Sequence, residues 1–192
     1  MAQRKVFIAW PTLLGLVIAG LLAWWLIPQF SPDYRTTPEF RKMVLAKITI
    51  INGAGEEIYL QVRVADERDE QLAGFQHIGR RVIAKSLILF IFPQEIQGKF
   101  HMRNVVAPLD IAFIKEDGEI TSIMEMEPGP KLYGPDGSFK YALEAPAGFF
   151  AARGISPGSR LVVPLSPPPL TLLPQFTPDT GRELWRDPGV II

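Results

Sequence analysis

The stretch Phe100–Phe113, FHMRNVVAPLDIAF, decides the fold. An apolar strand is interrupted at Arg103 and Asn104, the chain bends before Pro108, and Asp110 then stands within a second apolar run. A polar side chain between core-facing residues needs hydrogen-bond partners or a functional role, because burying it unpaired costs roughly 1–3 kcal/mol. The stretch therefore predicts two strands around a bend, with candidate site residues on both.

Further short strands are expected on both sides of this stretch. Alternating or wholly apolar runs predict them over Met43–Asn52, Glu57–Ala65, Leu87–Phe92, Lys99–Arg103, Leu109–Lys115, Phe139–Glu144 and Arg160–Leu165. Asp117 and Gly118 are expected to form a hairpin turn, and Pro128–Gly137 a long loop. Many short strands with one or two short helices predict a mainly β fold, a small β-sandwich or open barrel.

Two short helices are expected between the strands. The first, Glu67–Ala73, begins after Asp66 as the N-cap and ends at Gly74, while the second covers Ala147–Arg153. The folded domain is expected to span residues 43–165.

Composition excludes several classes of function. Twenty basic residues balance twenty acidic ones, so no net field would recruit nucleic acid. The chain has no cysteine, which excludes disulfides and thiolate chemistry, and only two histidines, which disfavours a histidine-rich metal site. No catalytic residue, metal or cofactor is predicted.

The N-terminal residues 1–30 are expected to anchor the chain in a lipid bilayer. The uncharged run Val6–Ile27 would rise about 33 Å as a helix, enough to cross the hydrocarbon core. A cleaved signal peptide is the alternative, but the run ends in bulky residues, AWWLIPQF, rather than in a small-residue cleavage site. We expect the N-terminus in the cytoplasm and the domain on the periplasmic, extracytoplasmic side.

The predicted anchor has a feature that indicates a partner helix. Gly15, Ala19 and Ala23 recur every four residues and would give the anchor a smooth face for another helix, although small residues are common in membrane helices. Residues 31–42 are expected to be a linker.

The C-terminal residues 166–192 are expected to form an extended, proline-rich tail. Seven of the 18 prolines fall in Pro164–Ile192. The same segment carries large apolar side chains, among them Leu172, Phe176 and Trp185, which a merely solvating tail would lack. We expect these residues to dock on their own domain or on an integral membrane partner.

The ordered motifs resemble one known family. They are Ala65-Asp66, Gly74, Leu89-Phe90-Ile91-Phe92-Pro93, Met102, Asn104, Pro108-Leu109-Asp110-Ile111, Leu143-Glu144, Gly148, Arg153-Gly154-Ile155 and Pro157-Gly158. In this order the chain resembles the family named domain of unknown function 192 (DUF192) over about Ile58–Val163. The resemblance implies a small, mostly β sandwich and no established activity.

The chain departs from the family pattern at several motif positions. His101 stands where the family has Trp, Arg103 replaces Lys, Val105 replaces Thr, and Gln76 replaces Met. If the family motif serves a ligand, this chain has altered the surface that would bind it.

Asn104, Asp110 and Glu144 are the polar residues that could form a site. In one interpretation they line a small pocket, where Asn104 orients a ligand and a carboxylate accepts a proton or hydrogen bond. In the other, Asn104 holds the bend, and the carboxylates pair with backbone N–H groups or with Arg103 and Arg153. Together with its neighbours the candidate ligand- or partner-binding set is His101, Arg103, Asn104, Asp110 and Glu144.

Two functions remain. The favoured one is a non-enzymatic interaction domain, an accessory or stabilising subunit of a larger membrane complex of respiratory, photosynthetic, secretory or envelope type. The anchor and the tail would give it two attachment points. The alternative is a membrane-tethered domain that binds or hydrolyses a small ligand around Asn104, Asp110 and Glu144.

Overall fold

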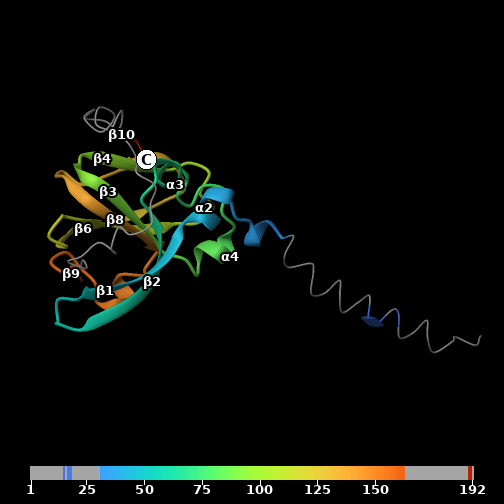
Figure 1. Cartoon of the computed structure of the whole chain (residues 1–192), viewed down its shortest axis with the longest axis horizontal. Coiled ribbons are helices and arrows are strands. Elements are labelled where there is room, and N and C mark those ends of the chain that lie inside the picture. Colours follow the sequence, from blue (N-terminus) through green and yellow to red (C-terminus); the bar gives the residue numbers. More distant parts are fainter. Residues whose placement is uncertain (1–14, 16, 19–30, 163–189, 192) are drawn as a thin grey trace, which may run out of the picture.

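The structure is a computed structural model and describes residues 15, 17–18, 31–162 and 190–191 (Figure 1). The elements in chain order are η2 (Pro32–Tyr34), α2 (Pro38–Lys42), β1 (Val44–Ile51), β2 (Glu57–Ala65), α3 (Arg68–Ala73), α4 (Arg80–Ile83), β3 (Ile88–Ile96), β4 (Gly98–Met102), β5 (Leu109–Ile114), β6 (Ile120–Met126), β7 (Gly129–Tyr133), β8 (Phe139–Pro146), η3 (Ala151–Arg153), β9 (Arg160–Val162) and β10 (Val190–Ile191). The described part is mainly β with a few short helices, as the sequence predicts.

The larger sheet curls into a half-barrel. Its seven strands follow the order β6-β5-β8-β3-β2-β1-β9 and are antiparallel, except for the parallel pair β2 and β3. The two edges approach each other at one end, where Glu119 bridges Arg160 and the Ile120 N–H donates to the Ser159 carbonyl at 2.9 Å. One buried cluster takes apolar residues from all seven strands and fills the inside of the curl.

A smaller layer covers the other face of this sheet. It consists of the sheet β10-β4-β7 and the short helices α2, α3 and α4. Phe100 in β4 fixes the layer, because its ring centroid lies 5.1 Å from that of Phe90 and 5.8 Å from that of Phe113. Strands β3, β5 and β8 are therefore covered on both faces, and every residue of β5 is buried. The apolar run Leu87–Phe92, expected as a strand, thus supplies most of the buried part of β3.

The segment predicted as a loop between residues 128 and 137 contains a strand. Residues Gly129–Tyr133 form β7, which pairs antiparallel with β4. β7 carries Pro130 and shows no apolar alternation, so its sequence reads as a loop. It can form a strand because it lies at the edge of its sheet, where the missing N–H of a proline costs no ladder hydrogen bond.

The predicted helices are shorter than expected. The first ends at Gly74 as predicted, but it begins at Arg68 with Glu67 as its N-cap, not Asp66. The Glu67 backbone N–H donates to the Glu70 carboxylate at 3.3 Å. Within the predicted second helix, only Ala151–Arg153 is helical, as the 3-10 turn η3.

The predicted linker, residues 31–42, folds onto the domain. It forms η2 and α2, and the side chain of Phe40 is only 1% exposed. The Phe40 ring packs 6.0 Å from the Phe75 ring, with the Arg63 guanidinium 4.4 Å from its centroid. The buried Phe40 ring therefore helps to dock this segment beside α3, together with the hydrogen bond from the Gly79 N–H to the Arg35 carbonyl at 2.8 Å.

The predicted anchor and tail fall mostly outside the described residues. No helix among the described residues is long and apolar enough to cross a membrane. Gly15 is helical and exposed, whereas Ala19, Ala23, Leu172, Phe176 and Trp185 are not among the described residues. The described Val190–Ile191 pairs in parallel with Gly98 and Lys99 of β4, so this end of the tail lies on its own domain.

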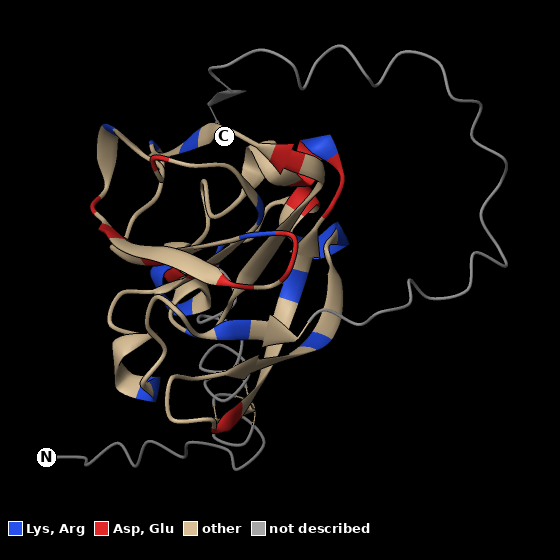
Figure 2. Ribbon diagram, turned by 90° about the vertical axis from the view of Figure 1, so that its left-hand side faces the viewer, with Lys and Arg blue, Asp and Glu red and all other residues tan. Residues whose placement is uncertain are grey.

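Charges of both signs are interspersed over the domain. Figure 2 shows acidic and basic positions scattered among one another over the face in view. Such a surface offers no extended field of one sign to a polyanion.

Candidate functional site

The structure places Asp110 and Glu144 on opposite faces of the larger sheet. Asp110 in β5 is paired with Ala145 in β8, while Glu144 is paired with Ile111. Paired residues point to the same face and neighbours in a strand point to opposite faces. Asp110 therefore faces the inside of the curl with Ala145, and Glu144 faces the smaller layer with Ile111. The predicted trio does not form one site.

Asp110 has a structural role. Its carboxylate is 7% exposed and accepts hydrogen bonds from the backbone N–H groups of Gly148, Phe149 and Phe150. Burial raises the pKa of this carboxyl, and the backbone hydrogen bonds oppose that rise. Asp110 therefore fits the interpretation in which the carboxylates pair with backbone N–H groups. Its hydrogen bonds stabilise the turn after β8.

Glu144 is a buried carboxyl group with an unpaired oxygen atom. It lies in the central strand β8 between Ile88 of β3 and Ile111 of β5 and is 5% exposed. Its Oε2 atom has no hydrogen-bond partner among the described residues. Burial among apolar groups raises the pKa of Glu144 from its ordinary value of 4.5 to about 8. A carboxyl group in this state needs either a proton or a ligand.

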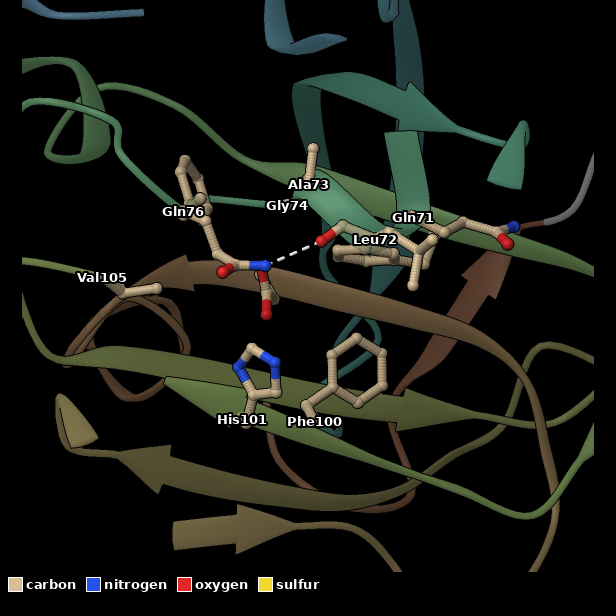
Figure 3. Close-up of a pocket in the computed structure, with 11 residues that line it drawn as sticks. Gln71, Leu72, Ala73, Gly74, Gln76, Phe100, His101 and Val105 are labelled. Atoms are coloured by element: carbon tan, nitrogen blue, oxygen red, sulfur yellow. Dashed lines mark hydrogen bonds between the residues drawn. The ribbon is translucent and has the colours of Figure 1, made fainter. Parts of the chain in front are cut away.

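Glu144 forms the base of a pocket between α3 and β4 (Figure 3). The cavity is about 20 Å³, enough for one group of the size of a water molecule. Phe75, Phe90 and Phe100 contribute aromatic walls, and Gln76 and His101 face each other across the mouth.

Gly74 leaves the space above the carboxylate open. Its φ angle is +46°, and a Cβ built there would lie 3.8 Å from Oε2 of Glu144 and 3.5 Å from the Phe90 ring. The glycine that ends α3 thus also clears the path to Glu144.

Asn104 positions the rim of this pocket. Its side-chain Nδ2 donates to Oε1 of Gln76 at 3.2 Å, and its carbonyl accepts from the His77 N–H at 2.9 Å. Asn104 and His77 are the described non-glycine residues with positive φ, at 60° and 61°. Gln76 in turn donates from Nε2 to the Leu72 carbonyl at 2.8 Å, the bond drawn in Figure 3. Two strained backbone positions therefore hold one glutamine in place.

His101 presents a hydrogen-bond donor at the mouth. Its Nδ1 accepts from the Arg103 backbone N–H at 3.3 Å, which places the proton of the neutral ring on Nε2. The Arg103 side chain is exposed and does not line the pocket.

The described residues offer little for catalysis or metal binding at this pocket. No three His, Asp or Glu side chains among them are grouped so as to hold a metal ion. The lining contains no Ser, Thr or Lys that could act as a nucleophile, and Glu144 and His101 are its titratable groups.

Sequence reasoning named Glu144, His101 and Asn104 and missed the role of Gln76. The available signal was its place among the family departures, because Gln76, His101 and Val105 all line this pocket. Their meeting depends on β4 packing over α3, which no single motif encodes.

The first prediction concerns the pH dependence of stability. The folded protein keeps the Glu144 proton up to about pH 8, whereas the unfolded chain releases it near 4.5, so folding takes up a proton between these values. This proton uptake adds to the free energy of unfolding. The added stability is fully present below pH 4.5 and is lost as the pH rises to about 8. Urea unfolding of the full chain in mild detergent should show the loss, with a slope of up to roughly 1.4 kcal/mol per pH unit.

The matched variant is Glu144→Gln, which keeps the shape of the side chain and cannot ionise. Burial also raises the pKa values of Glu70 and Asp110, so the difference between the wild type and this variant isolates Glu144. An identical pH slope in both proteins would contradict the assignment.

The second prediction concerns Asn104. Asn104→Ala should lower the free energy of unfolding by about 1–2 kcal/mol, because alanine is costly in the left-handed region and cannot hold Gln76. Asn104→Gly loses the same side chain without the backbone cost and should be less destabilised. Equal stabilities of the two variants, measured by urea unfolding, would show that the backbone strain is unimportant.

Comparison with known proteins places this site within a family. The DUF192 family, described as "Uncharacterized ACR", matches residues 49–163. A UPF0127 protein of Pyrococcus furiosus is 27% identical over 109 residues, which are 56% of this chain and 90% of that protein.

Two crystal structures have a similar fold. A protein of Sinorhizobium meliloti, provisionally described as a transcription regulator, superposes with a TM-score of 0.59 at 27% identity, covering 62% of this chain and 94% of its own. A protein of unknown function from Novosphingobium aromaticivorans gives a TM-score of 0.57 at 22% identity, covering 69% and 96%. Since the family pattern spans more than half of the sequence, the chain belongs to the DUF192 family.

Proposed function

We propose that this protein is a non-enzymatic binding domain, held at a membrane by Val6–Ile27, that takes up a small ligand in the Glu144 pocket. One observation carries the proposal: Oε2 of Glu144 is buried without a hydrogen-bond partner at the base of a cavity that opens to solvent between Gln76 and His101. Leaving such a group unpaired costs free energy, which a ligand at the same place would recover.

Binding fits the pocket better than hydrolysis. The lining supplies one carboxyl group and one imidazole but no nucleophile, and the cavity holds a single small group. A hydrolytic site needs room for both a water molecule and the scissile bond, with a base within hydrogen-bond reach of that water.

The membrane placement rests on the sequence. The uncharged run Val6–Ile27 is long enough to span a bilayer, and the domain follows it after a short segment. We place the domain on the periplasmic side, with the N-terminus in the cytoplasm.

The third prediction tests the pocket as a binding site. Methylammonium, acetate and acetamide present a cationic, an anionic and a neutral polar head to the cavity. At least one of them should raise the melting temperature of the full chain in mild detergent, because a ligand that binds only the folded state stabilises it. Glu144→Leu should abolish that rise.

Glu125→Gln is the matched control, because it removes a carboxylate of β6 that does not line the pocket, and it should keep the rise. If none of the three probes shifts the melting temperature, or if the shift persists in Glu144→Leu, the binding proposal is wrong.

A second candidate is the accessory subunit of a larger membrane complex. Its support is that Val162 in β9 and Val190 in β10 both lie in sheets, so residues 163–189 with their apolar side chains connect two points on the domain. A segment fixed at both ends loses less conformational entropy when a partner orders it.

The fourth prediction tests this candidate. Replacing Leu172, Phe176 and Trp185 together by serine should release a bound complex, measured as a fall in native mass after mild extraction from the membrane. The control replaces Thr171 and Gln175 by alanine and should leave the mass unchanged. A wild-type protein that migrates alone would exclude the subunit role.

A further inference from the structure

The chemistry of the Glu144 pocket selects one class of ligand. The group at its base is a carboxyl, whose ionised form only accepts hydrogen bonds. No Lys or Arg side chain lines the pocket, so an anion would meet a negative base without compensation. A ligand that brings its own positive charge and donors would satisfy Oε2.

The aromatic walls of the Glu144 pocket also favour a cationic ligand. Phe75, Phe90 and Phe100 line the cavity and are each no more than 2% exposed. Aromatic faces attract cations through their quadrupole, and the attraction grows when the cation is desolvated. A buried carboxylate beside aromatic rings thus forms a site for an organic cation.

The size of the cavity limits which organic cations can bind. About 20 Å³ accepts one group of the size of a water molecule. A primary ammonium head is of this size, whereas a quaternary ammonium carries four carbon substituents on its nitrogen and exceeds a cavity of about 20 Å³.

We propose that the pocket binds the head group of a small primary amine in its protonated form, with the ammonium hydrogen-bonded to Glu144 and its alkyl end directed past Gln76 and His101. The inference rests on the proposed binding function and specifies its ligand. As the ammonium binds, the carboxyl group releases its proton to solvent, so the bound pair is a carboxylate and an ammonium. Apparent affinity therefore rises with pH while Glu144 is protonated in the free protein.

The surroundings leave few other groups that could produce this pH dependence. From β4, His101 faces the pocket, and from β3 and the turn after β4 the lining residues are neutral. On α3, the nearby Glu70 carboxylate is engaged by the backbone N–H groups of Asp66 and Glu67. Glu144 and His101 are thus the two groups to separate by mutation.

The experiment is a titration of the full chain in mild detergent, followed by NMR with ¹³C-labelled glutamate carboxyl groups. Methylammonium should shift the Glu144 carboxyl signal toward the carboxylate position and perturb the Gly74 and His101 amides. The apparent dissociation constant should fall by up to about tenfold per pH unit below the Glu144 pKa, as one linked proton requires. Tetramethylammonium should have no effect.

Two variants show which residue causes the pH dependence of methylammonium binding. Glu144→Gln should weaken methylammonium binding at least tenfold and remove its pH dependence, while its fold is checked by the unchanged remainder of the spectrum. His101→Gln removes the other titratable lining group and should keep the pH dependence.

Each alternative result has its own meaning. If acetamide binds with Glu144 still protonated and methylammonium does not, the pocket is a site for neutral ligands, and the cation proposal fails while the binding function stands. If tetramethylammonium binds as well as methylammonium, the size argument fails and the primary amine with it. If no probe perturbs Gly74, both proposals are overturned.

Discussion

The packing of Phe100 against the larger sheet is the contact on which the rest of the structure depends. Its ring lies 5.1 Å from Phe90 of β3 and 5.8 Å from Phe113 of β5, and this contact lays β4 over strands that are already buried on their other face. Edge-to-face aromatic pairs of this kind contribute about 0.5–1.5 kcal/mol each beyond the area that they bury. With β4 in place, α3 and the turn after it have a surface to close against, and the pocket exists only because these two elements meet there.

The same packing makes Glu144 costly. A carboxyl group on a central strand, between Ile88 and Ile111, loses its hydration once the smaller layer closes over it. A hydrophobic side chain of similar volume would generally be neutral or stabilising at such a position. Asp110 is buried to a similar extent, but backbone N–H groups from the turn after β8 satisfy its carboxylate. The two acids therefore differ: the fold satisfies the carboxylate of Asp110, whereas Oε2 of Glu144 has no hydrogen-bond partner among the described residues.

Much of the fold could be predicted from the sequence, because the local pattern of apolar residues indicates where strands lie. The apolar runs, the Asp117-Gly118 turn and the glycine at the end of α3 each mark a boundary within a few residues. What could not be predicted depends on contacts between distant segments. β7 is a strand only because it pairs with β4, and Phe40 is buried only because α3 receives it. Likewise, Asp110 and Glu144 lie on opposite faces because of the pairing register between β5 and β8, and a one-residue shift would have brought them together.

The pocket is lined both by residues that resemble the family motifs and by residues that depart from them. The backbone features that build it, Gly74 at the end of α3 and Asn104 at a positive φ angle, are among the residues by which the sequence resembles the family, as is Glu144 at the base. The residues around the mouth are not: Gln76, His101 and Val105 all stand where the pattern has other side chains. The Asn104 side chain holds Gln76, whereas its backbone carbonyl accepts from the His77 N–H, so the turn keeps one hydrogen bond that does not depend on the side chain at the rim.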